Sequence, residues 1–321
     1  MVKNQIQRVF HTPVLVERVL EYLVTDFSGV YVDGTVGGGG HGEAILRRLN
    51  RRGRFIGIDR DREAVDFCHD RFSSYGDRVR ILHGDFGKVD LLLEELGITQ
   101  VDGFFLDLGL SSHQIDTPER GFSYLSEGPL DMRMDASVSG SAKDIVNGYS
   151  ERDLVDIFLR YGEERSARRV ARRIVRERRR RPIETTKALA DVIRKITPVQ
   201  RQIKTLARIF QALRIEVNRE LEQLKDGLER VYPFLKPGSR VVVISYHSLE
   251  DRLVKRFFRG ETPSTSREAL LQSDSGYRFH VLTRRVVRST QEEIQRHPTG
   301  RSSRLRAAEK IEDPREGDSC G

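Results

Sequence analysis

The stretch that decides the fold reads Tyr31-Val32-Asp33-Gly34-Thr35-Val36-Gly37-Gly38-Gly39-Gly40-His41-Gly42. It follows a short β-rich run and leads into the helical pattern Glu43-Ala44-Ile45-Leu46, so its glycines lie where a strand is expected to turn into a helix. Glycine adopts a positive φ at low cost and, without a Cβ atom, lets a ligand approach the backbone closely. The first amides of the following helix are donors that suit a carboxylate or a phosphate. This turn therefore predicts a site for a nucleotide-like cofactor.

Strand-like and helix-like segments alternate around this turn. The expected strands are 30–32, 54–58, 79–82 and 103–106, and the expected helices are 42–50, 61–73 and 87–96. Such alternation predicts an α/β fold, in which a doubly wound parallel sheet carries helices on both faces and binds ligands beyond the carboxyl ends of its strands. Each expected strand is followed by an aspartate, namely Asp33, Asp59, Asp85 and Asp107. One such residue is explained by a turn cap, but the set is better explained by a shared ligand cleft.

A helical segment interrupts the alternation. After Ser112 the chain reads first as a loop and then, from about 143 to 208, as helical without a strand signal. A long amphipathic helix is expected to begin at Phe210, and the most apolar strand of the chain follows at 241–245. We therefore predict an all-helical insertion within a doubly wound domain.

This interpretation divides the chain into three parts. The doubly wound domain takes residues 1–112 and 209–312, and the helical insertion takes 113–208. The charged tail 313–321 is expected to be disordered, and the segment from 260 to 276 is expected to be a mobile loop.

Composition places the chain among basic globular proteins. Its 321 residues carry a formal net charge of +8, which favours an anionic partner, with nucleic acid ahead of a membrane. Cys68 and Cys320 are the only cysteines and lack metal-type neighbours, so neither a disulfide framework nor a metal site is expected. No apolar run approaches the roughly 20 residues that span a bilayer, and no signal-peptide core begins the sequence. We therefore expect a cytoplasmic protein.

The segment from Arg165 to Arg181 holds ten arginines in 17 residues and a single acid, Glu177. Apolar residues recur in it at helical spacing, which predicts an amphipathic helix. A solvated face usually mixes both signs of charge, whereas this face is almost wholly positive. Contact with phosphates is therefore the favoured interpretation, and a solvated helix is the alternative.

Two cofactors fit the glycine turn. Gly37, Gly39 and Gly42 match the G-x-G-x-x-G spacing of dinucleotide-binding folds, which suggests NAD. Asp59 ends the second strand, where such folds place an acid on a ribose, and both NAD and S-adenosylmethionine (SAM) carry that ribose. Asp33 at the entry of the turn would repel a pyrophosphate but would attract the ammonium or sulfonium of SAM, so the residues favour SAM.

Other polar residues lie near the expected cleft. Phe86, after the third strand, suits either an adenine contact or the core. His41 is either a helix-start residue or a cofactor contact, and Gln114 follows the fourth strand. Polar groups also follow the fifth strand in Ser245-Tyr246-His247-Ser248. None of them has the spacing of a Ser/His/Asp triad, so a hydrolase is not supported.

With these residues assembled, the chain resembles the RsmH (MraW) family of SAM-dependent methyltransferases, which modify a cytosine N4 in small-subunit (16S) ribosomal RNA. The resemblance extends from His11 to Glu309. The motifs that carry it are Asp33-Gly34-Thr35, Gly39-Gly40-His41, Leu106-Asp107-Leu108-Gly109, Gly128-Pro129-Leu130-Asp131, Phe210-Gln211-Ala212-Leu213-Arg214 and His247-Ser248-Leu249-Glu250.

The resemblance implies a Rossmann-like methyltransferase sheet, SAM as the cofactor and N4-methylation of a cytidine in the decoding region of 16S rRNA, with the 30S subunit as partner. It implies cofactor contacts at Gly39, Gly40, His41, Asp59, Phe86, Asp107 and Gln114. Asp107 is also the catalytic candidate, because a carboxylate can accept the N–H bond of the attacking amine. The motif Asp107-Leu108-Gly109-Leu110 replaces the Asp-Pro-Pro-aromatic motif of many exocyclic-amine methyltransferases.

Two other functions remain open at this point. The literal dinucleotide spacing allows an NAD-dependent oxidoreductase, and the basic charge allows a non-catalytic RNA-binding factor of ribosome assembly. The sequence leaves the oligomeric state undecided between a monomer and a homodimer.

Overall fold

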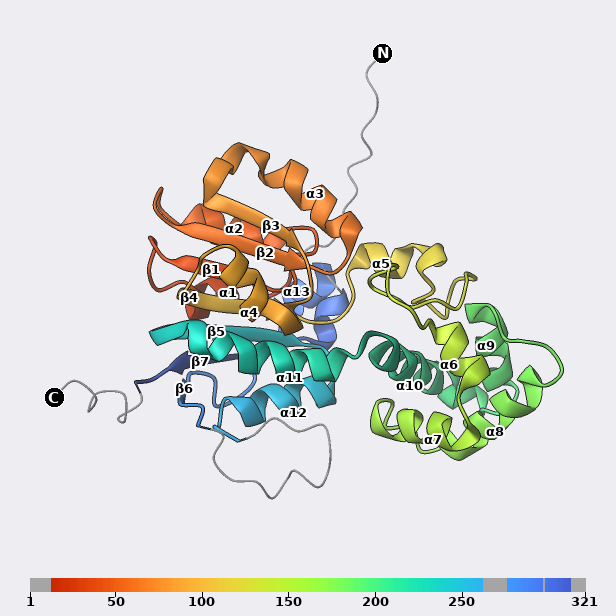
Figure 1. Ribbon diagram of the computed structural model, residues 1–321. Helices are drawn as coiled ribbons and strands as arrows, with labels where there is room; N and C mark the ends of the chain where they lie inside the picture. Colours follow the sequence, from red (N-terminus) through yellow and green to blue (C-terminus); the bar gives the residue numbers. More distant parts are fainter. Residues whose placement is uncertain (1–12, 262–275, 297, 313–321) are drawn as a thin grey trace, which may run out of the picture. The chain divides into compact units, whose positions relative to one another are not determined.

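The computed structural model describes residues 13–261, 276–296 and 298–312, which divide into two compact units (Figure 1). The sheet unit takes Met1–Gly109 and Leu221–Gly321, and the helical unit takes Leu110–Glu220. The expected disordered tail 313–321 and most of the expected loop, 262–275, lie outside the described residues.

The sheet unit is built on seven strands in the order β3-β2-β1-β4-β5-β7-β6. They are β1 (Val30–Asp33), β2 (Arg54–Asp59), β3 (Val79–His83), β4 (Val101–Asp107), β5 (Leu235–Ser245), β6 (Phe279–Val281) and β7 (Arg304–Lys310). The strands β1 to β5 pair in parallel, whereas β7 runs antiparallel to both β5 and β6. The predicted α/β sheet is thus confirmed, and the β6–β7 pair is an addition that the sequence patterns did not reveal.

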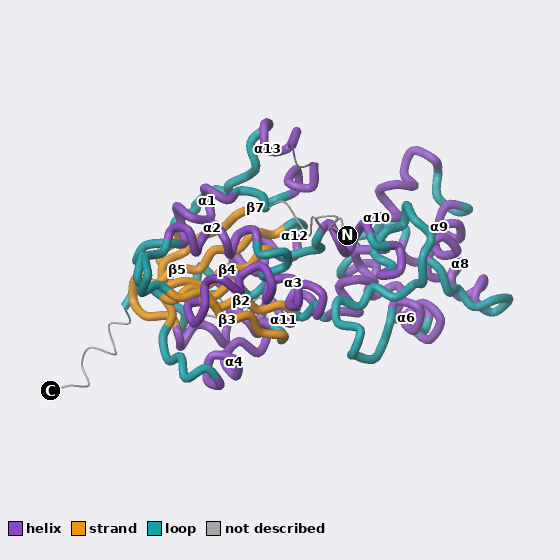
Figure 2. The backbone as a smooth tube through the Cα atoms, turned by 90° about the horizontal axis from the view of Figure 1, so that it is seen from above, coloured by secondary structure: helices purple, strands orange, loops and turns teal. Residues whose placement is uncertain are grey.

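Helices cover both faces of this sheet, as a doubly wound fold requires. One face carries α1 (Val16–Leu23), α2 (Gly40–Arg48) and α3 (Arg62–Phe72), and the other carries α4 (Val89–Glu95), α11 (Glu220–Val231) and α12 (Ser248–Phe257). The short helix α13 (Gln291–Arg296) follows near the end of the described chain. Neighbouring strand residues point to opposite faces, so Phe104 packs in one core layer and Phe105 in the other. Figure 2 shows the strands between these helical layers.

The winding of the sheet reverses between β1 and β4. In the register, Asp33 of β1 lies beside Gly57 of β2 and Phe105 of β4. The carboxyl ends of these three strands therefore meet at one edge, where doubly wound folds bind their ligands.

The helical unit contains no named strand among its described residues. Its helices are α5 (Ser112–Asp116), α6 (Ala142–Gly148), α7 (Glu151–Arg160), α8 (Ala167–Arg178), α9 (Thr186–Arg194) and α10 (Val199–Asn218). The helix α8 packs against α7 and α9, and α10 packs against α6, α7 and α9. In the part of the chain that the structure describes, no helix combines the length and apolar composition needed to cross a bilayer.

The predicted boundaries of the insertion, 113 and 208, differ from those of the helical unit, Leu110 and Glu220. The expected helix from Phe210 is also wrong, because α10 already begins at Val199 and ends at Asn218. Arg219 then adopts a left-handed conformation with φ 50°, and α11 starts at the next residue. Since arginine is an ordinary helix former, the sequence contained no sign of this break.

Replacing Gly39 by alanine is expected to destabilise the sheet unit by two additive effects. The residue has φ 75°, and a Cβ atom there would lie 2.7 Å from the ring of Phe72. Gly97 has a comparable φ of 64° with nothing within 4 Å of a Cβ, so Gly97→Ala isolates the backbone effect of about 1–2 kcal/mol. Chemical denaturation should show a further loss of about 1–3 kcal/mol for Gly39→Ala, and equal losses would contradict the steric account.

Candidate active site

The glycine turn between β1 and α2 is held in place by the end of β2 and by α3. The amide of Gly37 donates to Asp59 Oδ2 at 2.8 Å, and the Cys68 thiol donates to the Gly37 carbonyl at 3.2 Å. Arg71 donates to the Gly38 carbonyl at 2.9 Å. Sequence reasoning missed both α3 side chains, because their only signal is a helical spacing that places them on one face.

Two amides of the turn are already bound within the protein. Gly37 donates to Asp59, and Gly39 donates to the Val36 carbonyl at 2.7 Å. These two amides are therefore occupied within the protein, whereas the donors expected at the start of the following helix, which begins at Gly40, stay a prediction. What the turn presents to a ligand is a closely packed backbone next to carboxylates.

Three aspartates end the neighbouring strands β1, β2 and β4, and all three have raised pKa values. Burial, together with the charges of Asp107 and Asp59, raises the pKa of Asp33, which is 1% exposed, to about 8. Burial also raises the pKa of Asp59 to about 6 and that of Asp107 to about 7. Such a cluster of carboxyl groups stays partly protonated near neutral pH and favours a positively charged ligand.

A threonine links two of these aspartates. The Thr35 amide donates to Asp33 Oδ1 at 2.9 Å, and its hydroxyl donates to the same oxygen at 3.3 Å. That hydroxyl also accepts the Asp107 amide at 2.7 Å. Thr35 thus fixes the spacing between the ends of β1 and β4.

Asp107, the predicted catalytic residue, contacts a histidine and a tyrosine. The Tyr246 hydroxyl donates to Asp107 Oδ1 at 3.0 Å, and His41 Nδ1 lies 3.6 Å from Asp107 Oδ2. His41 is 6% exposed and lies in the first turn of α2, so its side chain faces the protein interior. The structure therefore brings His41 and Asp107 together and adds Tyr246, whose position after the fifth strand was the only sign of it in the sequence.

Asp59 is not the cap of the helix that follows it. That cap is Asp61, whose side chain accepts the Glu63 amide, while Asp59 accepts the amides of Gly37 and Asp61. Each carboxylate oxygen can accept more than one hydrogen bond, so these contacts leave capacity for a ribose hydroxyl.

Phe86 and Gln114 are placed differently. Phe86 is partly buried, and its ring packs so closely on α11 that a Cβ on Gly227 would lie 2.7 Å from it. Gln114 belongs to the helical unit, where its side chain accepts the Ser111 amide at 3.1 Å and completes the cap of α5. The cofactor role of both residues stays a prediction.

The carboxyl groups at this edge of the sheet fit SAM better than NAD. Asp33, Asp59 and Asp107 are acceptors in a poorly solvated environment, and SAM carries an ammonium and a sulfonium that such carboxylates attract. The pyrophosphate of NAD would instead meet three carboxyl groups that repel it when they ionise, without the amides of Gly37 and Gly39.

Comparison with known proteins identifies the family. The family model described as the MraW methylase family matches residues 8–311. The chain belongs to this family. It is therefore a methylase, and the SAM predicted from the turn is the cofactor of the family. This assignment excludes the NAD-dependent oxidoreductase, since the G-x-G-x-x-G match reflects only the density of glycines.

Curated relatives of this methylase cover almost its whole length. It is 46% identical to ribosomal RNA small subunit methyltransferase H of Syntrophotalea carbinolica, over 94% of this chain and 98% of that protein. It is 47% identical to the protein of the same name from Geobacter sulfurreducens, over 94% and 99%. Among solved structures, a SAM-dependent methyltransferase from Aquifex aeolicus is 11% identical with a TM-score of 0.40, over 93% of this chain and 90% of that one.

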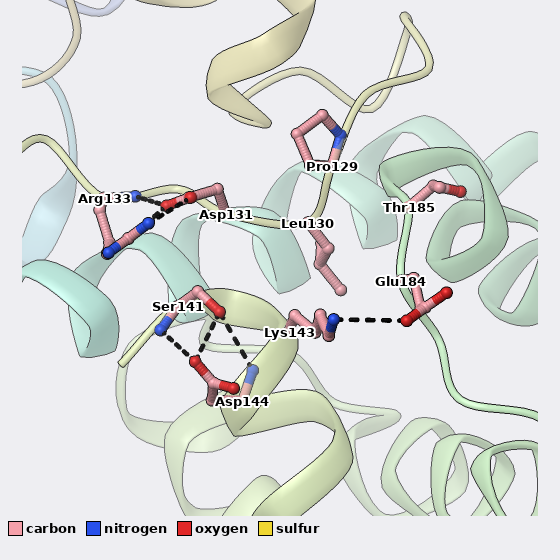
Figure 3. Close-up of a pocket in the computed structure, with 9 residues that line it drawn as sticks. All are labelled: Pro129, Leu130, Asp131, Arg133, Ser141, Lys143, Asp144, Glu184 and Thr185. Carbon is pink, nitrogen blue, oxygen red and sulfur yellow. Dashed lines mark hydrogen bonds and ion pairs between the residues drawn. The ribbon is translucent and has the colours of Figure 1, made fainter. Parts of the chain in front are cut away.

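A hollow of about 660 Å³ in the helical unit of the methylase is a second candidate site (Figure 3). Four of its charged groups form two pairs, since Lys143 lies 3.3 Å from Glu184 and Arg133 donates to Asp131 at 2.8 Å, and the fifth, Asp144, accepts the Ser141 hydroxyl. None of the residues that line it was predicted as a site residue, and the two partners of each ion pair neutralise each other's charge. The aspartate edge of the sheet is the better candidate for the chemistry.

Asp33→Asn is expected to change how the stability of the free methylase depends on pH. The folded pKa of about 8 exceeds the ordinary 3.8, so the folded state keeps a proton that the unfolded chain releases, and the free energy of unfolding falls as pH rises between these values. The variant does not show this fall. Each protein is compared with its own stability at pH 5. On that scale, the free energy of unfolding of the variant above pH 8 should exceed that of the wild type by more than about 1 kcal/mol.

Urea unfolding at pH 5, 7 and 9 measures this effect. Asp77→Asn is the control, because the Asp77 side chain is 98% exposed. Parallel pH curves for Asp33→Asn and the wild type would contradict the raised pKa.

Proposed function

We propose that this methylase transfers a methyl group from SAM to N4 of a specific cytidine in the decoding region of 16S rRNA, and that it acts on the 30S subunit. The observation that carries the proposal is the position of Asp107, which lies at the carboxyl end of β4 beside the glycine turn. The name of the curated relatives, which specifies small-subunit ribosomal RNA, supports the substrate class.

When bound, SAM supplies a methyl group on an already activated sulfonium, so the main task of the protein is to position the reactants. We assign the holding of SAM to the predicted residues of the sheet unit, Gly39, Gly40, His41, Asp59, Phe86 and Asp107. Asp59 would accept the ribose hydroxyls, and Asp33, whose ionised form lacks a counter-charge in the free protein, favours a cation at this edge. Phe86 would present the part of its ring that the core leaves exposed.

Asp107 would accept a hydrogen bond from the N–H group of the cytosine amine. The lone pair of this amine is delocalised into the ring, which makes it a poor nucleophile. A carboxylate that accepts a hydrogen bond from this N–H group helps to disperse the positive charge that develops during attack. The base must leave its stack to reach such a cleft, as base-modifying enzymes require.

Asp107→Asn is expected to reduce methyl transfer by roughly 10²–10⁴-fold while the protein stays folded, because the amide cannot take a proton. The measurement is the transfer of labelled methyl from SAM to small subunits from cells that lack this gene, followed by mass mapping of the RNA. Asp66→Asn, an exposed change on α3, is the control.

Each outcome of this experiment is decisive. Wild-type turnover by Asp107→Asn would overturn the catalytic assignment. A methyl group on another nucleotide would overturn the cytidine assignment, and no transfer by the wild-type protein would favour the non-catalytic assembly factor.

The arginine face of α8 supports RNA as the partner. Arg168, Arg172 and Arg176 recur every four residues and are exposed, whereas Val170 and Ile174 on the opposite side are buried. Within the described ranges of the chain, Arg172 is the one of these three with an ion pair, to Glu151 at 3.7 Å. The face can therefore contact phosphates without breaking strong ion pairs.

Replacing Arg168, Arg172 and Arg176 together by glutamine should weaken RNA binding and flatten its salt dependence. Three lost phosphate contacts correspond to a decrease of about two to three in the slope of log K against log salt. The charge-matched control changes Arg48, Arg51 and Arg52, which are exposed in the sheet unit. Equal slopes for the two triple variants would identify the α8 face as merely solvated.

A further inference from the structure

Tyr246, at the end of β5, has a fixed position at the candidate active site. Its amide donates to Glu250 Oε2 at 2.9 Å, and its hydroxyl donates to Asp107 Oδ1 at 3.0 Å. Its ring lies beside Gly109, where a Cβ atom would be 3.2 Å from Tyr246 Cδ2. Backbone, ring and hydroxyl are therefore all held by the ends of β4 and the start of α12.

The two oxygens of Asp107 face different groups. Oδ1 accepts the Tyr246 hydroxyl, whereas Oδ2 faces His41 Nδ1 at 3.6 Å. His41 Nε2 lies 2.9 Å from the Val14 carbonyl, which can only accept, so Nε2 carries a hydrogen. The nitrogen of His41 that can gain or lose a proton is therefore Nδ1, the one that faces Asp107.

The ring of His41 is fixed as firmly as that of Tyr246. It packs on Phe105 with 4.8 Å between ring centroids, and it is 6% exposed. The histidine thus holds a constant orientation toward Asp107 Oδ2.

We propose that Tyr246 is a positioning residue for methyl transfer, which binds Asp107 Oδ1 so that Oδ2 accepts the proton of the amine and shares it with His41 Nδ1. This inference rests on the proposed function and adds to it the path of the proton. Tyr246 itself touches neither reactant in this scheme and acts through Asp107.

The step balances as follows. The amine nitrogen forms a bond to the methyl carbon with its lone pair, and the electron pair of the carbon–sulfur bond stays on sulfur, which becomes a neutral thioether. The electron pair of one N–H bond returns to nitrogen, and its proton goes to Asp107 Oδ2. The Tyr246 hydroxyl keeps its own hydrogen throughout, since burial and the Asp107 charge raise the pKa of Tyr246 well above 10.

Tyr246 is needed because the other surroundings of Asp107 disfavour its ionised form. Burial raises the pKa of Asp107 to about 7, and the charge of Glu250 on α12 acts in the same direction. Asp33 on β1 is a further acid that interacts with Asp107, and His41 on α2 faces it. The hydrogen bond from Tyr246 lowers the pKa of Asp107 and so keeps a carboxylate ready to accept.

Tyr246→Phe keeps the ring and the amide bond to Glu250 but removes this hydrogen bond. The acidic limb of the kcat–pH profile is expected to move upward by about one to two pH units, because a hydrogen bond to a charged group is lost. Turnover should fall about tenfold or more near neutral pH and recover toward the wild-type value at pH 9, with little change in the KM for RNA.

A second measurement does not depend on activity. The carboxyl carbon of Asp107 in the free protein, followed by NMR through a pH titration, should show an upward shift of the pKa in Tyr246→Phe. Tyr232→Phe is the matched control, since the Tyr232 hydroxyl accepts the Arg278 amide at 2.9 Å elsewhere in the sheet unit.

The outcomes separate this inference from the proposed function. An active wild-type enzyme with the same pH profile and the same Asp107 titration in Tyr246→Phe would overturn the positioning role. A turnover that stays low at pH 9 would also overturn it, because it would point to structural damage. A wild-type protein that transfers no methyl group would instead overturn the proposed function.

Discussion

The hydrogen bond from the Asp107 amide to the Thr35 hydroxyl, 2.7 Å long, joins the ends of two strands that are 72 residues apart in sequence. The parallel register makes it possible, because Asp33 lies beside Phe105 and the next pair of alternate residues is Thr35 and Asp107. Through this bond the turn after β1 is attached to the acid after β4. The candidate active site depends on this joint, since it sets the distance between the glycine turn and Asp107.

The same edge of the sheet brings three acidic side chains together. Asp33, Asp59 and Asp107 lie at the ends of three adjacent strands, and burial raises the pKa of each. Carboxylates in such an arrangement are costly when ionised without a counter-charge, so the free protein holds protons that a cationic ligand can replace. A site that costs stability when empty is what a methylase with a positively charged cofactor requires, and it differs from the phosphate-binding edge of dinucleotide folds.

The helical unit shows where local patterns stop being informative. Asn218, at the end of α10, accepts the Met134 amide at 2.8 Å and donates to the Met132 carbonyl at 2.8 Å. Met132 has φ 64°, an unusual conformation for a methionine that this contact helps to hold. These residues are more than 80 positions apart, and the break at Arg219 is stabilised by the bidentate pair of Arg214 and Glu220. No periodicity could have revealed them, which is why the predicted boundary at 208 differs from the end of the helical unit at Glu220.

By itself, the sequence determined the alternation of strands and helices, the glycine turn, the acids at the strand ends and the family, because these features depend on residue type and on spacing along the chain. Tertiary structure alone decided that the amides of Gly37 and Gly39 are already bound and that Asp61, not Asp59, caps α3. It also decided that Tyr246 and His41 face opposite oxygens of Asp107. The physical reason is that the protonation and orientation of a buried group depend on neighbours that folding brings together from distant parts of the chain.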